Sequence, residues 1–401
     1  MTTSIVEHMK QITKLKIALT IAPSLFWMIV AVLYFTEGKG LSTSEVFQLV
    51  GWYYFLGILF EYPTGVIGDY YSHKLSVFLG YVICVIGLVW LLFAGGYWGV
   101  FIFYFLYALG ASLIMGSDWA LLHSVSDNFK NDLSDLKIWS GFMRALEMVA
   151  AGILTKIFGL EVAIYLTIIA FMIGGMLLLT ISEPVVSTGK SKNRIPKKKH
   201  LINLIGSEVK AMWKLSWDGL KKVACSSKLA GVLFLGALTG AFAMLLKWLL
   251  NPFFLYLQID LQWWGIIGGA GFLFVSLGTW LYKKDKIIVE SSKGLLFLLM
   301  VFAGSIFFLG VKPVALLALA VFQISRGAIG TKLTVDLNKL IKDNERASIM
   351  SLKSVVRKVF ISILSVVVGF LLGHFGFSVT VTVLAVVLLG GSLFILTLMN
   401  D

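Results

Sequence analysis

Long apolar runs, separated by short polar segments, are the dominant pattern of this chain. Residues 295–311, 314–322 and 377–399 contain almost no ionisable side chain. A helix needs about 20 apolar residues to cross the roughly 30 Å hydrocarbon core of a bilayer. The pattern therefore predicts an all-α membrane protein.

Twelve transmembrane helices fit this pattern, six on each side of a central polar stretch. Their approximate ranges are 17–36, 44–67, 75–94, 98–122, 137–158, 162–182, 229–257, 263–282, 293–310, 313–335, 347–373 and 377–399. Short turns around Gly159 and Gly376 separate the last two spans of each half. We predict a six-helix bundle at 1–186, a cytoplasmic linker at 187–226 and a second, pseudo-symmetric six-helix bundle at 227–401.

The distribution of Lys and Arg predicts the orientation, because cytoplasmic loops of membrane proteins are enriched in both. With both termini in the cytosol, 28 of the 34 Lys and Arg residues fall in inner segments. Only 3 fall in outer loops, and another 3 lie inside spans. One missed or extra span would place basic segments on both sides of the membrane and remove this asymmetry. We therefore expect an even number of spans, cytoplasmic termini and a multi-pass protein of the cell membrane.

The polar stretch between the two halves has two parts. Residues 187–199 are rich in Ser, Lys and Arg, which is typical of a flexible linker. Within 200–223, apolar residues recur at helical spacing among lysines. Such an amphipathic helix would lie in the inner headgroup layer and bind anionic lipid. A plain solvated connector is the alternative.

Composition supports the membrane assignment and excludes several functions. Hydrophobic residues make up 58% of the chain and charged residues 14%, against about 25% charged in soluble domains. The net charge of +13 gathers in loops on one side, so we do not expect nucleic acid as a partner. Cys84 and Cys225 give no disulfide framework or metal spacing. No phosphate-binding glycine loop occurs. We expect no enzymatic activity, no cofactor and a monomer.

Two segments carry a family resemblance. The turn after the second span reads Glu61-Tyr-Pro-Thr-Gly65, followed by Asp69 and a basic pair, His73-Lys74. It resembles the signature loop of the major facilitator superfamily, and Glu-x-Pro-Thr-Gly resembles a branch of drug and metabolite exporters. The start of the eleventh span, 346–353, is similar to the same branch. Tyr70 and Ser72 depart from the usual Arg and Gly. The resemblance implies a secondary transporter in which two six-helix halves alternate access to a central site.

The signature loop also has a physical reading as a gate. Gly65 would let the second span approach a neighbouring helix closely. Asp69 would accept hydrogen bonds from the positive N-terminus of the eleventh span and so close the inner side. The alternative is that Asp69 only pairs with Lys74 or Lys137 in the headgroup layer.

Charges inside spans are expensive in lipid, so they indicate partners or a watery cavity. Arg144 and Glu147 lie three residues apart on one face of the fifth span. Glu147 is the deepest acid, so we predict that it binds the coupling proton or a cationic substrate, with Arg144 adjusting its acidity. A purely structural ion pair is the alternative.

Further candidates lie in the fourth, seventh and tenth spans. Asp118 could pair with Arg144 as an inner gate or simply sit at the interface. Arg326, which follows Gln323, is a candidate partner of Glu147 or Glu61, or an anion ligand. Gln323 and Asn251 are further candidates for substrate binding. Lys247 lies one turn before Asn251-Pro252, where we expect the seventh helix to kink or break. Alternatively, Lys247 reaches the outer surface.

Several aromatic residues fall within spans rather than at the interfaces. Trp27 and Trp52 are the candidates for contact with an apolar substrate, and ordinary packing is the alternative. Together these residues support a proton-coupled exporter of a small apolar or amphiphilic compound. Two alternatives remain open: uptake of a small anionic metabolite by Arg326 and Lys247, and a non-transporting receptor or scaffold.

Overall fold

The computed structural model describes residues 2–24, 26–182, 226–284, 292–341 and 346–400, together with Trp217, Leu220, Lys221 and Val223. Most of the predicted amphipathic helix at 200–223 lies outside the described residues, and so does the linker before it. Within the described part of the chain, all regular secondary structure is helical and no strand occurs. This confirms the predicted all-α class.

The helices of the first half follow the predicted spans with two interruptions. They are α1 (Thr2–Ile21), η1 (Phe26–Ile29), α2 (Ala31–Leu33), η2 (Tyr34–Gly38), α3 (Thr43–Tyr70), α4 (His73–Phe93), α5 (Gly96–Ile114), α6 (Ser117–Val125), α7 (Phe129–Phe158) and α8 (Val162–Leu179). The first span is broken after α1, where Pro23 disfavours a helical conformation in the residue before it. The fourth span is broken between α5 and α6, where Gly116 has a φ of 88°.

The second half contains longer uninterrupted helices. They are α10 (Ser227–Tyr256), α11 (Leu261–Lys284), α13 (Ser292–Phe308), η3 (Lys312–Val314), α14 (Ala315–Leu340) and α15 (Arg346–Asn400). Within α15, Gly376 is non-helical (φ 76°, ψ −179°) and divides the element into two arms, at the glycine where the sequence predicted a turn. The seventh helix does not break at Pro252, because α10 continues through this proline, and a kink there stays a prediction.

Within the described parts of the chain, eight helical segments are long and apolar enough to cross a membrane, and Gly294–Phe308 is a shorter apolar helix. These segments establish a multi-pass membrane protein. The count does not equal twelve. One segment, Ser348–Met399, spans both arms of α15, and α3 and α7 are not among the eight.

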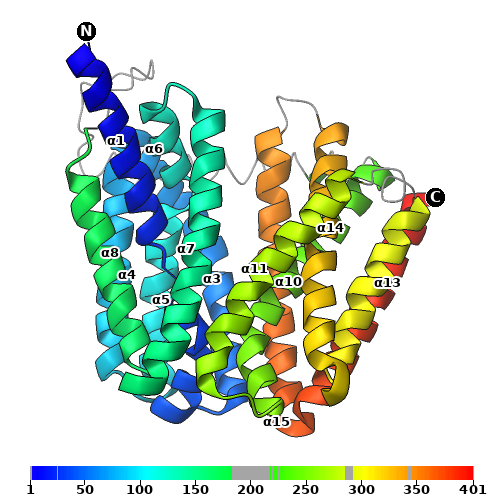
Figure 1. Cartoon of the computed structure of the whole chain (residues 1–401). Coiled ribbons are helices and arrows are strands. Elements are labelled where there is room, and N and C mark those ends of the chain that lie inside the picture. Colours follow the sequence, from blue (N-terminus) through cyan, green and yellow to red (C-terminus); the bar gives the residue numbers. More distant parts are fainter. Residues whose placement is uncertain are drawn as a thin grey trace.

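The helices form two groups (Figure 1). Helices α1 to α8 lie on one side and α10 to α15 on the other, with both chain termini at the same end. The groups approach each other at the opposite end and diverge toward the termini. Contact between the groups runs mainly along two pairs of helices, α3 with α15 and α7 with α11. We call these pairs the two seams.

Candidate functional site

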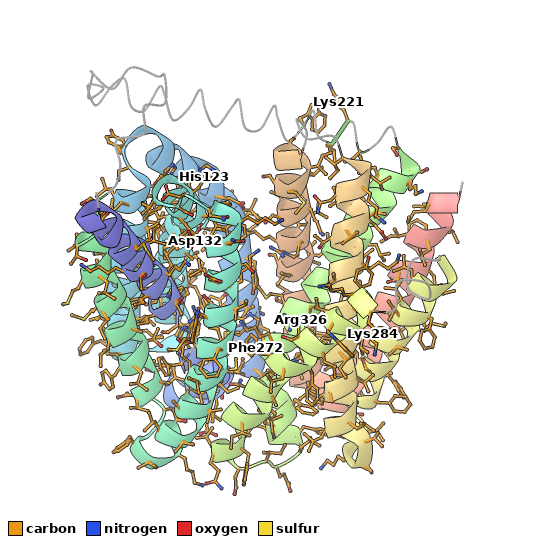
Figure 2. All side chains as sticks on the ribbon, turned by 45° about the horizontal axis from the view of Figure 1, so that its top comes forward. His123, Asp132, Lys221, Phe272, Lys284 and Arg326 are labelled. Atoms are coloured by element: carbon orange, nitrogen blue, oxygen red, sulfur yellow. The ribbon has the colours of Figure 1, made fainter. Side chains whose placement is uncertain are left out.

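Three predicted substrate-binding residues line one cavity. Lys247 comes from α10, whereas Gln323 and Arg326 come from α14. The other lining side chains are all aliphatic or aromatic, among them Phe253 and Phe322. The cavity has a volume of about 20 Å³, room for about one water molecule. Arg326 lies near the middle of the molecule (Figure 2). A larger ligand therefore requires the cavity walls to move apart.

This cavity carries two cations and no carboxylate. The Arg326 Nη1 atom donates a hydrogen bond to Gln323 Oε1 at 3.2 Å. Among the described residues, no acid lies within ion-pair distance of Arg326 or Lys247. Arg326 is close enough to repel the Lys247 ammonium group. Because charges inside a membrane protein normally face a partner or a watery path, this excess of positive charge fits an anionic ligand.

The predicted pairing of Arg326 with an acid is wrong. Glu147 binds Arg144, with Nη1 at 3.0 and 2.8 Å from its two carboxylate oxygens. Glu61 binds Lys358, with Nζ 2.6 Å from Oε2. Both candidate acids are therefore neutralised by cations other than Arg326.

The Arg144–Glu147 pair is buried inside the first half, and the Glu147 side chain is only 3% exposed. The second guanidinium nitrogen of Arg144 donates to the carbonyl oxygen of Thr20 at 3.1 Å. Thr20 lies in the last turn of α1, where carbonyls have no partner within the helix. The break in the first span thus supplies a backbone acceptor, and Arg144 links α7 to α1 there.

Asn251 stabilises this interrupted first span farther along the chain. Its Oδ1 atom accepts from the backbone nitrogens of Val32 (3.0 Å) and Leu33 (3.4 Å). Its Nδ2 atom donates to the Ile29 carbonyl at 3.0 Å. The free N–H groups at the start of α2 are thereby capped by a side chain from the other half. Asn251 is 1% exposed and does not line the cavity of Lys247, although we expected it to bind substrate.

The two predicted tryptophans have different positions. Trp27 is buried among aromatic rings, with ring centroids 5.6 Å from Tyr107 and 6.0 Å from Trp248. It packs at the junction of the two halves but does not line the cavity. Trp52 is 43% exposed and contacts Phe55, which is also exposed, on the outer surface of α3. Trp27 is therefore part of the aromatic packing, and contact of either tryptophan with a substrate stays a prediction.

The predicted gating residues have local partners. Lys74 Nζ donates to the Leu179 and Ile181 carbonyls at the end of α8, at 3.1 and 2.5 Å. The predicted Asp118–Arg144 pair is wrong, because Asp118 Oδ1 accepts from the backbone nitrogens of Gly116 (3.1 Å) and Trp119 (2.8 Å). Asp118 therefore caps the start of α6.

The close helix approach in the signature loop occurs at a different glycine from the predicted one. A Cβ atom on Gly65 would meet nothing within 4 Å, whereas on Gly68 it would lie 2.6 Å from Ser117 Oγ. The neighbouring Thr64 hydroxyl donates to the Ser112 carbonyl at 3.0 Å. The loop thus packs against the break between α5 and α6. The side chain of Asp69 lies outside the described residues.

Three residues near the candidate site were missed by the sequence reasoning. Lys358 and Arg357 fall within the predicted eleventh span, but they were counted with the inner polar segment. Their position in an otherwise apolar run is the signal that could have found them. Trp248 donates from Nε1 to the Tyr54 hydroxyl oxygen at 3.3 Å, across the two halves. No pattern of spacing indicates that contact.

A two-group bundle of membrane helices with charged residues at its centre is the architecture of a secondary transporter. A family model of the Major Facilitator Superfamily matches residues 16–365. The chain belongs to this superfamily, a family of transporters rather than enzymes. The predicted family, transport function and absence of enzymatic activity are confirmed, whereas the specific exporter branch stays a prediction. A search of curated proteins gave no match.

Solved structures share this fold at low sequence identity. The nucleoside transporter NupG has a TM-score of 0.72 and 14% identity, covering 98% of this chain and 99% of that chain. A bacterial homolog of the human lysosomal transporter Spinster, in an inward-facing and unoccupied conformation, has a TM-score of 0.71 and 12% identity, covering 98% and 95%. A POT family transporter in complex with 5-aminolevulinic acid has a TM-score of 0.71 and 13% identity, covering 98% and 96%.

Proposed function

We propose that this secondary transporter carries a small amphiphilic organic anion, bound between Lys247, Gln323 and Arg326, by alternating access of its two halves. The observation that carries the proposal is the cavity with two cations and no described carboxylate. The aliphatic and aromatic walls suit an apolar body, and the Gln323 amide can orient a polar group of the ligand. Widening of the contracted cavity accompanies binding.

Ligand-dependent thermal stability tests this proposal. The purified full chain is heated with pairs of aromatic carboxylates and their uncharged amides. We expect the carboxylates alone to raise the unfolding temperature, since a ligand at 100 times its Kd stabilises by about 2.7 kcal/mol. The R326Q and K247M variants should lose this response. Equal stabilisation by the amides, or an unchanged response in both variants, would contradict an anion site.

A second proposal concerns the driving ion and the direction. Glu147, adjusted by Arg144, carries the coupling proton for export of the substrate. Its support is the burial of Glu147, whose side chain is 3% exposed and forms an ion pair with Arg144. Protonation of Glu147 would weaken its ion pair with Arg144, and Arg144 would keep its hydrogen bond to the Thr20 carbonyl oxygen of α1.

Transport in proteoliposomes with an imposed pH gradient tests the coupling. In wild type, export should accelerate when protons flow inward. Glu147→Gln should lose this acceleration but keep substrate exchange in the absence of a gradient. If Glu147→Gln responds to the gradient as wild type does, the coupling role is wrong. Accumulation in place of extrusion would reverse the proposed direction.

The same proposal includes twelve spans, cytoplasmic termini and residence in the cell membrane as a monomer. It also includes an anionic-lipid contact of 200–223 and the Asp69 latch, with Gly65 free in the present conformation and available for closure. The span number and the orientation are supported by the distribution of Lys and Arg, of which 28 fall in inner segments and 3 in outer loops. Reporter fusions at 192 and 284 should lie on the same side of the membrane, and opposite sides would overturn the topology.

A further inference from the structure

Two further cations lie on α15 in slots made by glycines of α10. A Cβ atom added to Gly236 would lie 2.9 Å from Cε of Lys353, and one added to Gly240 would lie 3.1 Å from Cδ of Arg357. Both distances are shorter than ordinary van der Waals contact, so a side chain at either glycine would require the facing cation to shift. The two glycines, one helical turn apart, therefore make room for two cationic side chains one turn apart on the facing helix.

Neither cation forms an ion pair with an acid in the described part of the chain. Lys353 and Arg357 are partly buried, and no hydrogen bond or ion pair joins either of them to a described residue. Arg357 lies close enough to Lys353 to repel it, and close enough to the Tyr54 hydroxyl group of the other half to influence it electrostatically.

The described acids nearby are already engaged. Asp336 binds Lys332 at 3.1 Å, and Glu61 binds Lys358 at 2.6 Å. Partly buried cations without such partners are costly inside a membrane protein unless they meet water or an anion.

The slots and the cavity share one face of α10. Gly236, Gly240 and Lys247 are spaced by four and seven residues, which keeps them within about 40° around the helix. At 1.5 Å per residue, they extend over about 16 Å of depth. Lys353 and Arg357 therefore lead from the end near the chain termini toward the cavity of Lys247 and Arg326.

We propose that Lys353 and Arg357 form a second anion-binding site, which holds the carboxylate, sulfonate or phosphate group of an organic anion on its path to the cavity. This inference rests on the proposed anionic substrate. It adds a second binding site for the anionic group of the substrate. The ligand of this site is an anion from solution rather than a lipid headgroup. Successive cations raise the local anion concentration and the rate of capture.

Binding of a matched pair of dyes tests this site. The full chain is reconstituted in phosphatidylcholine nanodiscs. It is titrated with an anilinonaphthalene sulfonate dye and with uncharged phenylnaphthylamine, and the signal of empty discs is subtracted. The K353Q/R357Q variant should bind the sulfonate at least tenfold more weakly and the uncharged dye as wild type does. K283Q/K284Q removes two exposed charges from the end of α11 and should change neither affinity by more than twofold.

The exchanged variant K353R/R357K keeps both charges and should retain sulfonate binding within about threefold, which separates loss of charge from loss of packing. Normal sulfonate binding by K353Q/R357Q would overturn the second site. If R326Q still weakens binding in that case, the proposed substrate class stands, whereas unchanged binding in both variants removes both proposals. If the effect of K353Q/R357Q disappears when phosphatidylglycerol is added to the discs, a lipid headgroup occupies the slots and the proposal is wrong.

Discussion

The two seams between the halves are built from different chemistry. Along α3 and α15, side chains bond across the boundary. Ser44 Oγ donates to the Gly369 carbonyl at 2.6 Å, and Ser362 Oγ donates to the Gly51 carbonyl at 2.9 Å. Lys358 reaches the Gly57 carbonyl at 3.2 Å in addition to its ion pair with Glu61.

Along α7 and α11, contact is between backbones. A Cβ atom on Gly152 would lie 2.8 Å from the Gly265 nitrogen, and one on Gly265 would overlap the Met148 carbonyl. Small residues let membrane helices approach closely, and polar side chains can hydrogen-bond across them. The α3–α15 seam has close backbone contact as well, because a Cβ atom on Gly51 would lie 2.9 Å from the Ser362 carbonyl oxygen and one on Gly369 would lie 2.8 Å from the Ser44 carbonyl oxygen. The α7–α11 seam therefore depends on close backbone contact, whereas the α3–α15 seam adds specific polar side chains to such contact. The comparison predicts that the α7–α11 seam responds to added side-chain volume, and that the α3–α15 seam responds to the loss of a polar partner.

The largest effect should come from filling the glycine seam. Gly265→Leu forces side-chain atoms into the Met148 backbone, which cannot move aside by changing a rotamer. We therefore expect failure to fold, an effect beyond the roughly 1–3 kcal/mol typical of overpacking. Size-exclusion profiles and thermal unfolding measure this. Gly304→Leu is the control, because nothing lies within 4 Å of a Cβ there. Equal damage at both positions would mean that the seam is not specially tight.

Removing one charge from the polar seam should have the next largest effect. Glu61→Leu leaves Lys358, which is 7% exposed, without its partner, and such a loss typically costs about 3–5 kcal/mol. Denaturant unfolding measures the change. The E61L/K358M double variant should recover most of the stability, because no unpaired charge remains. A double variant as unstable as the single one would refute a pairing energy.

A contact outside both seams should have an intermediate effect. Asn251→Ala leaves the first turn of α2 without a cap, which costs about 1–2 kcal/mol. Asn251→Asp keeps the acceptor for Val32 and Leu33 but loses the donor to Ile29, so the two variants separate the functions of the amide. Cysteine accessibility of the first span, measured beside unfolding, should increase in both. Unchanged accessibility would argue against a role in holding the halves together.

The smallest effect should come from a single hydroxyl in the polar seam. Ser362→Ala removes one bond to a carbonyl, and such bonds in membrane proteins contribute about 0.6 kcal/mol on average. Thr382→Ala, whose hydroxyl bonds only within its own helix, is the matched control. A loss of unfolding free energy above about 2 kcal/mol for Ser362→Ala would show that other contacts of the seam depend on this hydrogen bond.

Much of the architecture could be predicted because it depends on local chemistry. Apolar runs of sufficient length predict helices, and the turn at Gly376 appears where the sequence predicted it. The Arg144–Glu147 pair also follows from spacing alone, since residues three apart on a helix are neighbours. Lys247, Gln323 and Arg326 stood out as polar residues in apolar runs, and they share a cavity.

The sequence by itself therefore determined which segments are helical and which neighbours on one helix meet. Only the tertiary structure decided the partners between helices: Glu61 with Lys358 rather than Arg326, Gly68 rather than Gly65 against Ser117, and Asn251 against the first span. The physical reason is that periodicity fixes the face on which a side chain lies. What that face meets depends on how distant helices are positioned and where their backbones are interrupted.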